Sequence, residues 1–189
     1  MSSLGNLTVL TGPSGVGKGT IVKKILDSHS DVWLSISATT RKPRSGETEG
    51  KHYFFLEKKR FQEMIDKDGF LEWASFSNNF YGTPKKIVKE KIEQGTNVLL
   101  EIELQGARQI RKTFPDALQI FLAPPDLIEL EKRIRGRGTE SEESIRDRFA
   151  IANKELIAKQ EFDAVVINEN LDTAYKEIEE LMGLESNEK

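Results

Sequence analysis

The chain contains no cysteine, and this absence removes several kinds of chemistry at once. Disulfide bonds, thiolate metal sites and cysteine nucleophiles are all excluded. No apolar run approaches the ~18 residues needed to span a bilayer, and the first six residues have neither the basic start nor the apolar stretch of a secretory signal. We therefore expect a cytoplasmic protein that does not depend on a membrane.

Net positive charge is also missing, because 28 lysines and arginines are balanced by 31 aspartates and glutamates, for a formal net charge of −3. General nucleic-acid binding needs a basic surface, so we expect no nucleic-acid partner. Only two histidines are present. His29 lies near the end of an expected helix and His52 in a polar loop, and both are expected at the surface. The sequence therefore offers no convincing general base.

The 189 residues are enough for one domain with a substantial core. Apolar, strand-like segments alternate with amphipathic, helix-like segments. Such alternation predicts an α/β fold with a parallel sheet covered by helices on both faces. The expected strands are 7–11, 32–37, 97–104, 117–122 and 163–168. The expected helices are 17–29, 84–95, 105–113, 126–136, 140–160 and 171–184.

Two regions depart from this alternation. Between Ser37 and Gly95 come a polar loop, an aromatic run, a helix near 57–67 and a strand-like segment at 70–73, which together predict a small inserted α+β region. A second insertion is expected at 136–139, where two glycines flank Arg137 and form a hinge-capable loop. Thr139 and Glu142 there have the spacing of a capping box that starts the next helix.

The most informative segment is the glycine-rich run that directly follows the first apolar strand. A strand, a glycine-rich turn and a helix start form a phosphate cradle: backbone N–H groups turn inward, the helix N-terminus adds partial positive charge, and a lysine supplies a full charge. The alternative is a strand-to-helix turn without a ligand. The residues of this segment are Gly12, Pro13, Ser14, Gly15, Val16, Gly17, Lys18, Gly19 and Thr20.

One position of this segment departs from the usual phosphate-loop pattern. Gly19 stands where a serine or threonine hydroxyl would ligate magnesium, and Thr20 comes one residue late, which rotates its side chain by ~100° on a helix. Magnesium can also be held largely by phosphates and waters. Glu101 and Glu103 are candidate ligands, directly or through water, because a period-two strand would point both carboxylates to one face. Two solvated charges at a fraying strand end are the alternative.

A second candidate phosphate site lies at Arg41-Lys42-Pro43-Arg44. Each guanidinium can bind a phosphate as a bidentate fork, and the hydroxyls of Tyr53 and Tyr81 could complete an anion pocket. A basic loop is also commonly a solvated surface, and Tyr53 could be ordinary core packing. Two phosphate sites in one small domain suggest a donor and an acceptor, as in phosphoryl transfer.

Taken together, a series of motifs closely resembles the guanylate kinase family in its bacterial, single-domain form. The resemblance runs from about Leu7 to the helix near Tyr175. Its motifs, in chain order, are Gly12-Pro-Ser-Gly-Val-Gly-Lys18, Ser37-x-Thr-Thr-Arg-x-Pro-Arg44-x-Gly-Glu47, Gly50-x-x-Tyr53-x-Phe55, Phe70-Leu-Glu-Trp73, Tyr81-Gly-Thr83 and Gly136-Arg-Gly-Thr-Glu140.

The resemblance implies a phosphate-loop NTPase fold with an inserted GMP-binding region and a helical lid. Within a single domain, 1–189, it implies a core at about 5–36, 97–125 and 158–184, the GMP-binding insertion at about 37–96 and the lid at about 126–157. It implies that the chain transfers the γ-phosphoryl group of ATP to GMP, and to dGMP, with magnesium. The sequence leaves the oligomeric state open.

The resemblance also implies roles for individual residues. Lys18, Arg41, Arg137 and Arg148 match charge-stabilising positions, the last two on the lid, and Arg133 and Asn168 match positions near the adenine of ATP. Glu72 matches the guanine-reading carboxylate, although by itself Glu72 could equally be a solvent-facing strand residue. The positions that match the GMP site are Ser37, Arg41, Arg44, Tyr53, Glu72, Tyr81, Thr83 and Glu101.

Two departures from the family pattern affect the metal, since Gly19 lacks the hydroxyl and Glu101 stands where some members have aspartate. Two other functions stay open on the sequence. Guanylate-kinase-like scaffold domains bind peptides without catalysis, but their phosphate loop is often degraded, whereas Lys18 is present here. A related phosphotransferase could also act on a different phosphorylated acceptor, although the match at Glu72 and Thr83 favours guanine.

Overall fold

The computed structural model describes residues 4–136 and 142–185. Five strands form one parallel sheet in the order β2-β7-β1-β8-β9, which confirms the expected α/β class. The second and third expected strands are shorter than the sequence pattern predicts. The strands are β1 (Leu7–Thr11), β2 (Val32–Leu34), β7 (Asn97–Glu101), β8 (Leu118–Ala123) and β9 (Ala164–Ile167).

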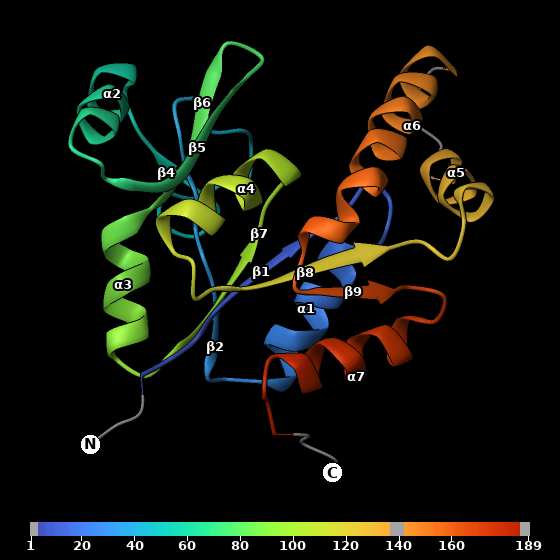
Figure 1. Ribbon diagram of the computed structural model, residues 1–189. Coiled ribbons are helices and arrows are strands. Elements are labelled where there is room, and N and C mark those ends of the chain that lie inside the picture. The colour runs from blue at the N-terminus through green and yellow to red at the C-terminus, as the bar shows by residue number, and fades with distance from the viewer. Residues whose placement is uncertain (1–3, 137–141, 186–189) are drawn as a thin grey trace.

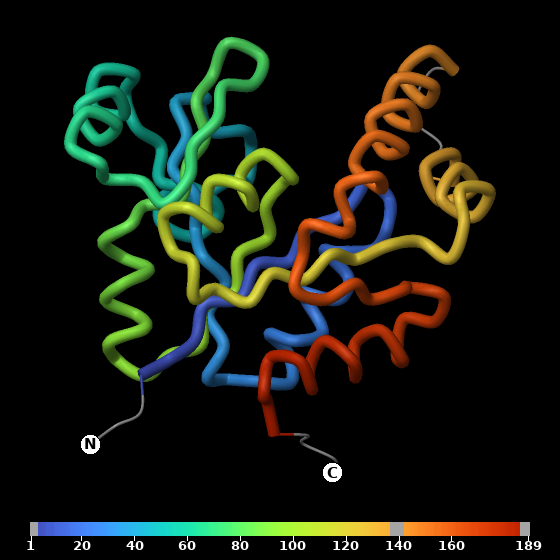
Figure 2. Tube along the Cα trace, in the orientation of Figure 1, coloured from blue at the N-terminus to red at the C-terminus, as the bar shows by residue number. Residues whose placement is uncertain are grey.

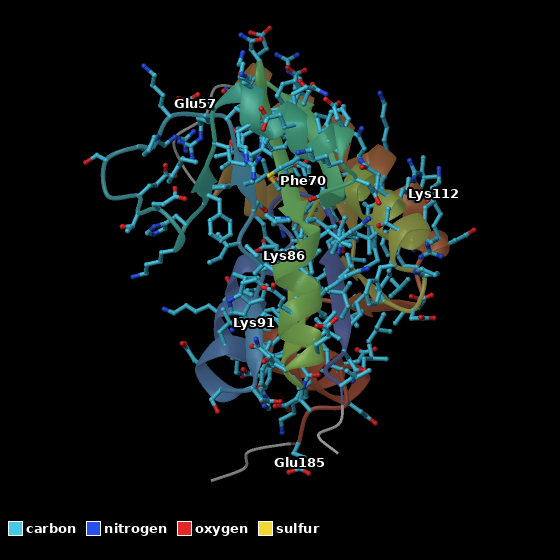
Figure 3. All side chains as sticks on the ribbon, turned by 90° about the vertical axis from the view of Figure 1, so that its left-hand side faces the viewer. Glu57, Phe70, Lys86, Lys91, Lys112 and Glu185 are labelled. Carbon is cyan, nitrogen blue, oxygen red and sulfur yellow. The ribbon has the colours of Figure 1, made fainter. Side chains whose placement is uncertain are left out.

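Helices cover both faces of this sheet (Figure 1). Successive strand residues point to opposite sides, and because both sides carry apolar residues, each face packs against helices. Leu10 of β1 packs with α1 (Lys18–Ser28) and α7 (Leu171–Leu181) on one face. Its neighbour Val9 packs with α3 (Lys85–Glu93) and α4 (Leu104–Thr113) on the other. Figure 3 views the molecule from the α3 side, with Lys86 and Lys91 labelled on that helix. Although α3 falls within the expected insertion, its Val88 and Ile92 pack on the central sheet.

The inserted region contains a second, mixed sheet in the order β4-β3-β6-β5. Its core is aromatic: the buried Phe61 of α2 stacks on Phe70 and Phe80. The sequence pattern predicts β5 only as far as Trp73 and does not predict β6. The elements are β3 (Ala38–Thr39), β4 (Phe54–Phe55), α2 (Lys58–Asp66), β5 (Phe70–Phe76) and β6 (Asn79–Pro84).

Two packed helices occupy the region for which the sequence predicts a lid. Leu130 and Ile134 of α5 (Leu127–Arg135) pack against Ile145 and Ala152 of α6 (Glu142–Ile157), and a short 3-10 turn, η1 (Ala158–Glu161), follows. α5 ends at Arg135, and Gly136 is its C-cap residue. Arg137 and the capping residue Thr139 lie outside the described residues. None of the helices within the described ranges is both long enough and apolar enough to cross a membrane.

Both accessory regions stand at the same edge of the central sheet (Figure 2). The mixed sheet with α2 rises on one side, and α5 with α6 on the other, while the two termini lie at the opposite edge. The edge between the accessory regions is the one at which the parallel strands end. In open α/β sheets, ligands bind outside these carboxyl ends.

A buried polar cluster joins the far ends of α1 and α7, and it corrects the expectation for His29. That histidine is 3% exposed, and its Nε2 lies 2.6 Å from Oε1 of the buried Glu179. The Tyr175 hydroxyl donates to the same oxygen at 2.6 Å. Burial raises the pKa of Glu179, but the hydrogen bonds from Tyr175 and His29 outweigh it, and the pKa is lowered. His52 is exposed, as expected.

Candidate active site

The glycine-rich segment forms the predicted turn between β1 and α1. Gly12 (φ 147°) and Gly17 (φ 103°) have backbone angles that side chains rarely allow. A Cβ at Gly12 would lie 2.2 Å from the Leu122 carbonyl oxygen, and one at Gly17 would lie 2.6 Å from Nδ2 of Asn168. Asn168 is buried, and its Nδ2 donates to the Val16 carbonyl at 2.8 Å. Close packing against Leu122 and Asn168 therefore fixes the conformation of the loop.

Lys18 lies at the first position of α1, folded over the loop. Its Nζ donates to the carbonyl oxygens of Gly12 (2.5 Å) and Pro13 (3.2 Å). Glu101, at the end of the neighbouring strand β7, lies close enough that the lysine charge acts on it: burial raises the pKa of Glu101, and Lys18 partly offsets this. A cation and a carboxylate thus stand together beside the phosphate cradle.

Gly19 marks the place where a metal ion could be bound beside the loop. A Cβ built on Gly19 would lie 4.0 Å from Oε1 of Glu101, so this carboxylate faces the place where the missing hydroxyl side chain would begin. Thr20 is exposed. Within the described residues, no group of three or more histidine, aspartate or glutamate side chains is arranged to hold a metal alone. A magnesium ion here would depend on phosphate and water ligands as well.

Glu103 does not share a strand face with Glu101, and that prediction was wrong. β7 ends at Glu101, and Glu103 is the N-cap residue of α4, with extended backbone angles. The apolar pattern continues through Ile102 and Leu104, but the helix begins at Leu104, so the alternation of a strand no longer applies. Both carboxylates nevertheless line the same cavity.

This cavity, of about 280 Å³, lies between the mixed sheet and the end of β7. It brings together residues that are far apart in the sequence, as a binding site for one small molecule requires. Five of the predicted acceptor residues line it: Ser37, Tyr53, Glu72, Tyr81 and Glu101. The sequence reasoning missed other lining residues, namely Ala74, Phe76, Gly82, Ile102, Gln105 and Gly106. Of these, the glycines carried a signal, because glycine inside a strand or helix often marks a close approach.

At the inner wall of the cavity, Glu72 is buried, which removes its interpretation as a solvent-facing residue. Thr83, on the paired strand β6, donates its hydroxyl to Oε1 of Glu72 at 2.6 Å. Burial raises the pKa of Glu72, the Thr83 hydrogen bonds lower it, and the nearby charge of Glu103 raises it, so the pKa is raised overall. A buried carboxylate held by Thr83 on one side remains able to accept further hydrogen bonds from a ligand.

Near the mouth of the cavity, Arg41 is held by Glu47. The two groups form a bidentate pair with distances of 2.8 and 3.0 Å, and the Glu47 carboxylate also accepts the backbone N–H of Arg44 at 2.7 Å. These hydrogen bonds lower the pKa of Glu47 to about 2. The Arg41 guanidinium lies 5.4 Å from the ring centre of Tyr53, whose own ring centre is 6.2 Å from that of Tyr81. Glu47 therefore orders the basic loop, a contact that its motif position did not reveal.

Exchanging Glu47 for glutamine tests this ordering. The variant keeps the side-chain size but loses the charge that holds both Arg41 and the Arg44 backbone, so phosphate binding at this loop should weaken. We expect the KM for a phosphorylated acceptor to rise about tenfold, while kcat changes less. Steady-state kinetics check this, with Glu63→Gln as a matched control, because the Glu63 carboxylate pairs with Arg60 on its own helix and lies outside the basic loop. An unchanged KM would show that the loop is ordered without Glu47.

The arginines that the sequence predicts on a lid have separate partners. Arg148 of α6 donates from Nη2 to the Ser14 hydroxyl of the phosphate loop at 2.5 Å, so it contacts the loop directly. Arg133 of α5 instead donates from Nε to Glu129 on its own helix, at 3.0 Å. The third lid arginine, Arg137, is outside the described residues.

Comparisons of the sequence and of the fold with known proteins all find guanylate kinases. A family model described as guanylate kinase matches residues 5–185. The chain is 85% identical over 184 residues to a guanylate kinase of Prochlorococcus marinus (strain NATL2A), covering 97% of this chain and 99% of that protein. It is 58% identical to a guanylate kinase of Synechococcus sp. (strain CC9902), covering 98% and 100%. The crystal structure of guanylate kinase from Anaplasma phagocytophilum is similar with a TM-score of 0.74 and 30% identity, covering 96% of this chain and 86% of that one.

Proposed function

This chain belongs to the guanylate kinase family, and on that premise we propose how its own residues phosphorylate GMP with ATP, giving ADP and GDP. The observation that carries the proposal is the pairing of two sites at one sheet edge. A phosphate cradle with Lys18 lies beside a cavity whose inner wall holds the buried Glu72. Donor and acceptor can thus meet with their phosphates between them.

On the acceptor side, Glu72 reads the base. Guanine presents an N1–H and a 2-amino group side by side, and one carboxylate can accept from both. Adenine lacks these donors and would leave a buried carboxylate unpaired, at a cost of about 1–3 kcal/mol or more for a charged group. Thr83, already bonded to Glu72, holds that carboxylate and lies near the base. We extend the proposal to dGMP, which presents the same guanine edge.

The GMP phosphate occupies the other end of the cavity. Ser37, Tyr53 and Tyr81 line it there and offer hydroxyl groups. Arg41 and Arg44 approach from the loop ordered by Glu47. Phosphate forms bidentate hydrogen bonds with guanidinium groups, so these two arginines supply both charge and direction.

On the donor side, the loop N–H groups and Lys18 receive the ATP phosphates. Asn168 donates from Nδ2 to Val16, so its amide oxygen is the group left for the adenine amine. Arg133 lies on α5 and is proposed at the outer side of the adenine. Arg137 and Arg148 are proposed as lid arginines that meet the transferring group, with the regions at about 37–96 and 126–157 closing over the core at about 5–36, 97–125 and 158–184.

The reaction needs no general base. The second pKa of a phosphate monoester is about 6, so the GMP phosphate is mostly a dianion at pH 7 and already a nucleophile. The barrier comes from repulsion between two polyanions and from in-line placement. Lys18, Arg41 and Arg148 reduce the repulsion, and the phosphate cradle and the cavity together fix the line of attack.

A magnesium ion fits beside the donor phosphates. Glu101 faces the start of α1 at Gly19, and oxygen ligands suit this metal, so Glu101 would hold it directly or through water. Glu103, which lines the same cavity, is proposed as a further ligand through water. When bound, the ion neutralises phosphate charge. Because no hydroxyl is available at position 19, we infer that protein contacts supply only part of its coordination.

Replacing Arg148 with alanine tests the lid. Because this guanidinium reaches Ser14 of the phosphate loop and not the guanine cavity, its loss should lower kcat at least tenfold and change GMP binding little. Stopped-flow kinetics and GMP calorimetry would separate the two effects, with the exposed Arg146→Ala on the same helix as the control. If GMP affinity alone collapsed, the lid assignment would be wrong.

A coupled assay of ADP release tests the whole proposal. Purified protein is supplied with ATP and with GMP, dGMP, AMP or UMP in turn, with and without magnesium. We expect rapid turnover only with the guanine nucleotides and the metal. Binding of GMP without any ADP release would overturn the proposal and favour a non-catalytic module.

A further inference from the structure

β5 is an edge strand of the mixed sheet, so one side of its backbone has no neighbouring strand. In a β-strand, alternate residues direct their backbone groups to opposite sides. Glu72 pairs with Thr83 of β6, and the register of the two strands shifts at Leu71. On either side of Glu72, the Leu71 carbonyl and the N–H and carbonyl of Trp73 bond outside the sheet. Such edge groups need another partner, or they are left to water.

Side chains of α4 take the place of the missing strand. Oε1 of Gln109 accepts the Trp73 N–H at 3.0 Å, and its Nε2 donates to the Trp73 carbonyl oxygen at 2.8 Å. Thr113 donates its hydroxyl to the Leu71 carbonyl oxygen at 2.7 Å. A glutamine amide has one donor side and one acceptor side, like a peptide group, so Gln109 reproduces a two-bond strand pairing. The backbone is thereby held on both sides of Glu72.

The same face of α4 also touches the Glu72 carboxylate. Gly106, Gln109 and Thr113 follow one another at spacings of three and four residues, so they share one side of the helix. A Cβ at Gly106 would lie 2.9 Å from Oε2 of Glu72 and 3.3 Å from its Cδ. Glycine costs about 1 kcal/mol in a helix relative to alanine, and here it permits this close approach. α4 thus fixes both the backbone and the head group of Glu72.

We propose that Gln109 is a positioning residue for guanine selectivity: by pairing with the Trp73 backbone it sets where Glu72 presents its carboxylate in the cavity. The inference rests on the proposed function of Glu72 and adds a residue outside the cavity to it. Hydrogen-bond selectivity depends on placement within fractions of an ångström, and Thr83 alone holds only one carboxylate oxygen. A loosened β5 would let Glu72 move away from the base.

The test replaces Gln109 with methionine, which has a similar length but can form neither hydrogen bond. The KM for GMP should rise about tenfold, and the ratio of kcat/KM for GMP to that for IMP, which lacks the 2-amino group, should fall about tenfold. The kcat at saturating GMP and the KM for ATP should change less than about threefold. Gln62→Met is the matched control, because Gln62 of α2 is exposed and bonds only Asp66 on its own helix.

A second variant keeps the inference falsifiable if Gln109→Met does not fold. Thr113→Val preserves shape and removes the bond to Leu71, together with a longer bond to the Gln109 carbonyl within α4, so it should lower the same ratio by about threefold. A merely structural role would lower the melting temperature and reduce the rates with both acceptors equally, leaving the ratio unchanged. An unchanged ratio in the folded variants would overturn the inference.

Binding measurements separate this inference from the proposed function. Calorimetry of GMP and IMP, without ATP, reports selectivity whether or not turnover occurs. If the wild-type protein failed to phosphorylate GMP, the proposed function would fall. If the wild-type protein turned over and bound GMP selectively but Gln109→Met bound it with the same selectivity, only the role of Gln109 would fall.

Discussion

Replacing Lys18 with alanine will lower kcat/KM by at least ~10²-fold while the fold stays intact. This lysine is the full positive charge at the mouth of the phosphate cradle, and its bonds to Gly12 and Pro13 show that its Nζ already lies over the loop. No other described lysine lies in the loop. The transferring phosphoryl group would lose a charge that is worth most where water is excluded.

The fold should tolerate the change because the apolar face of α1 does not involve Lys18. That face is formed by Ile21, Val22 and Ile25, which pack under the central sheet. Circular dichroism and thermal unfolding would confirm this, and Lys23→Ala, an exposed position on the same helix, is the control. A rate equal to that of the wild-type protein would remove Lys18 from the mechanism.

The second large effect is expected on the selectivity for the guanine base of the acceptor. Replacing Glu72 with leucine should lower the ratio of kcat/KM for GMP to that for AMP by ~10²-fold, because the acceptor of two guanine donors is lost from a buried position. Steady-state kinetics with both acceptors measure this, with the exposed Glu90→Leu on α3 as the control. Retained discrimination would mean that another group reads the base.

The raised pKa of Glu72 adds a pH dependence with a defined sign. A protonated carboxyl donates where guanine also donates, so kcat/KM for GMP should fall as the pH is lowered through this raised pKa, from above the ordinary value of 4.5. Stability changes in the opposite direction. The neutral form is favoured by burial, so its contribution to folding is full below the unfolded pKa and is lost as the pH rises through the folded one. Glu72→Gln should lose the part of both changes that comes from this carboxyl, while the fall in kcat/KM caused by protonation of the GMP phosphate near pH 6 remains.

Several elements could be predicted from the sequence because their signals are local. The glycine run places the turn between β1 and α1 within a residue, and α5 and α7 begin where capping side chains, Asp126 and Asn170, precede apolar periodicity. The tip of the β5–β6 hairpin was not predicted. Ser77 and Asn78 there both have positive φ, which glycine would have signalled more clearly.

In the candidate site, too, residues within motifs could be predicted from the sequence, whereas contacts between distant segments could not. Motif spacing identified five residues that the structure brings to one cavity, because each motif lies at a strand end or turn. Sequence could not show that Gln109 bonds the Trp73 backbone, since that contact depends on where α4 lies relative to an edge strand 36 residues away. His29 was placed wrongly for a related reason: its partner Glu179 is 150 residues further along the chain.

The cluster of His29, Tyr175 and Glu179 has a consequence for how the protein can be engineered. α1 carries the nucleotide-binding loop at its start, and this cluster ties its other end to the last helix. Removing α7 would expose His29 and the apolar side of α1 that packs against that helix. A shortened version of the protein should therefore keep α7, because this helix supports α1 and the nucleotide-binding loop although it lies far from the phosphates.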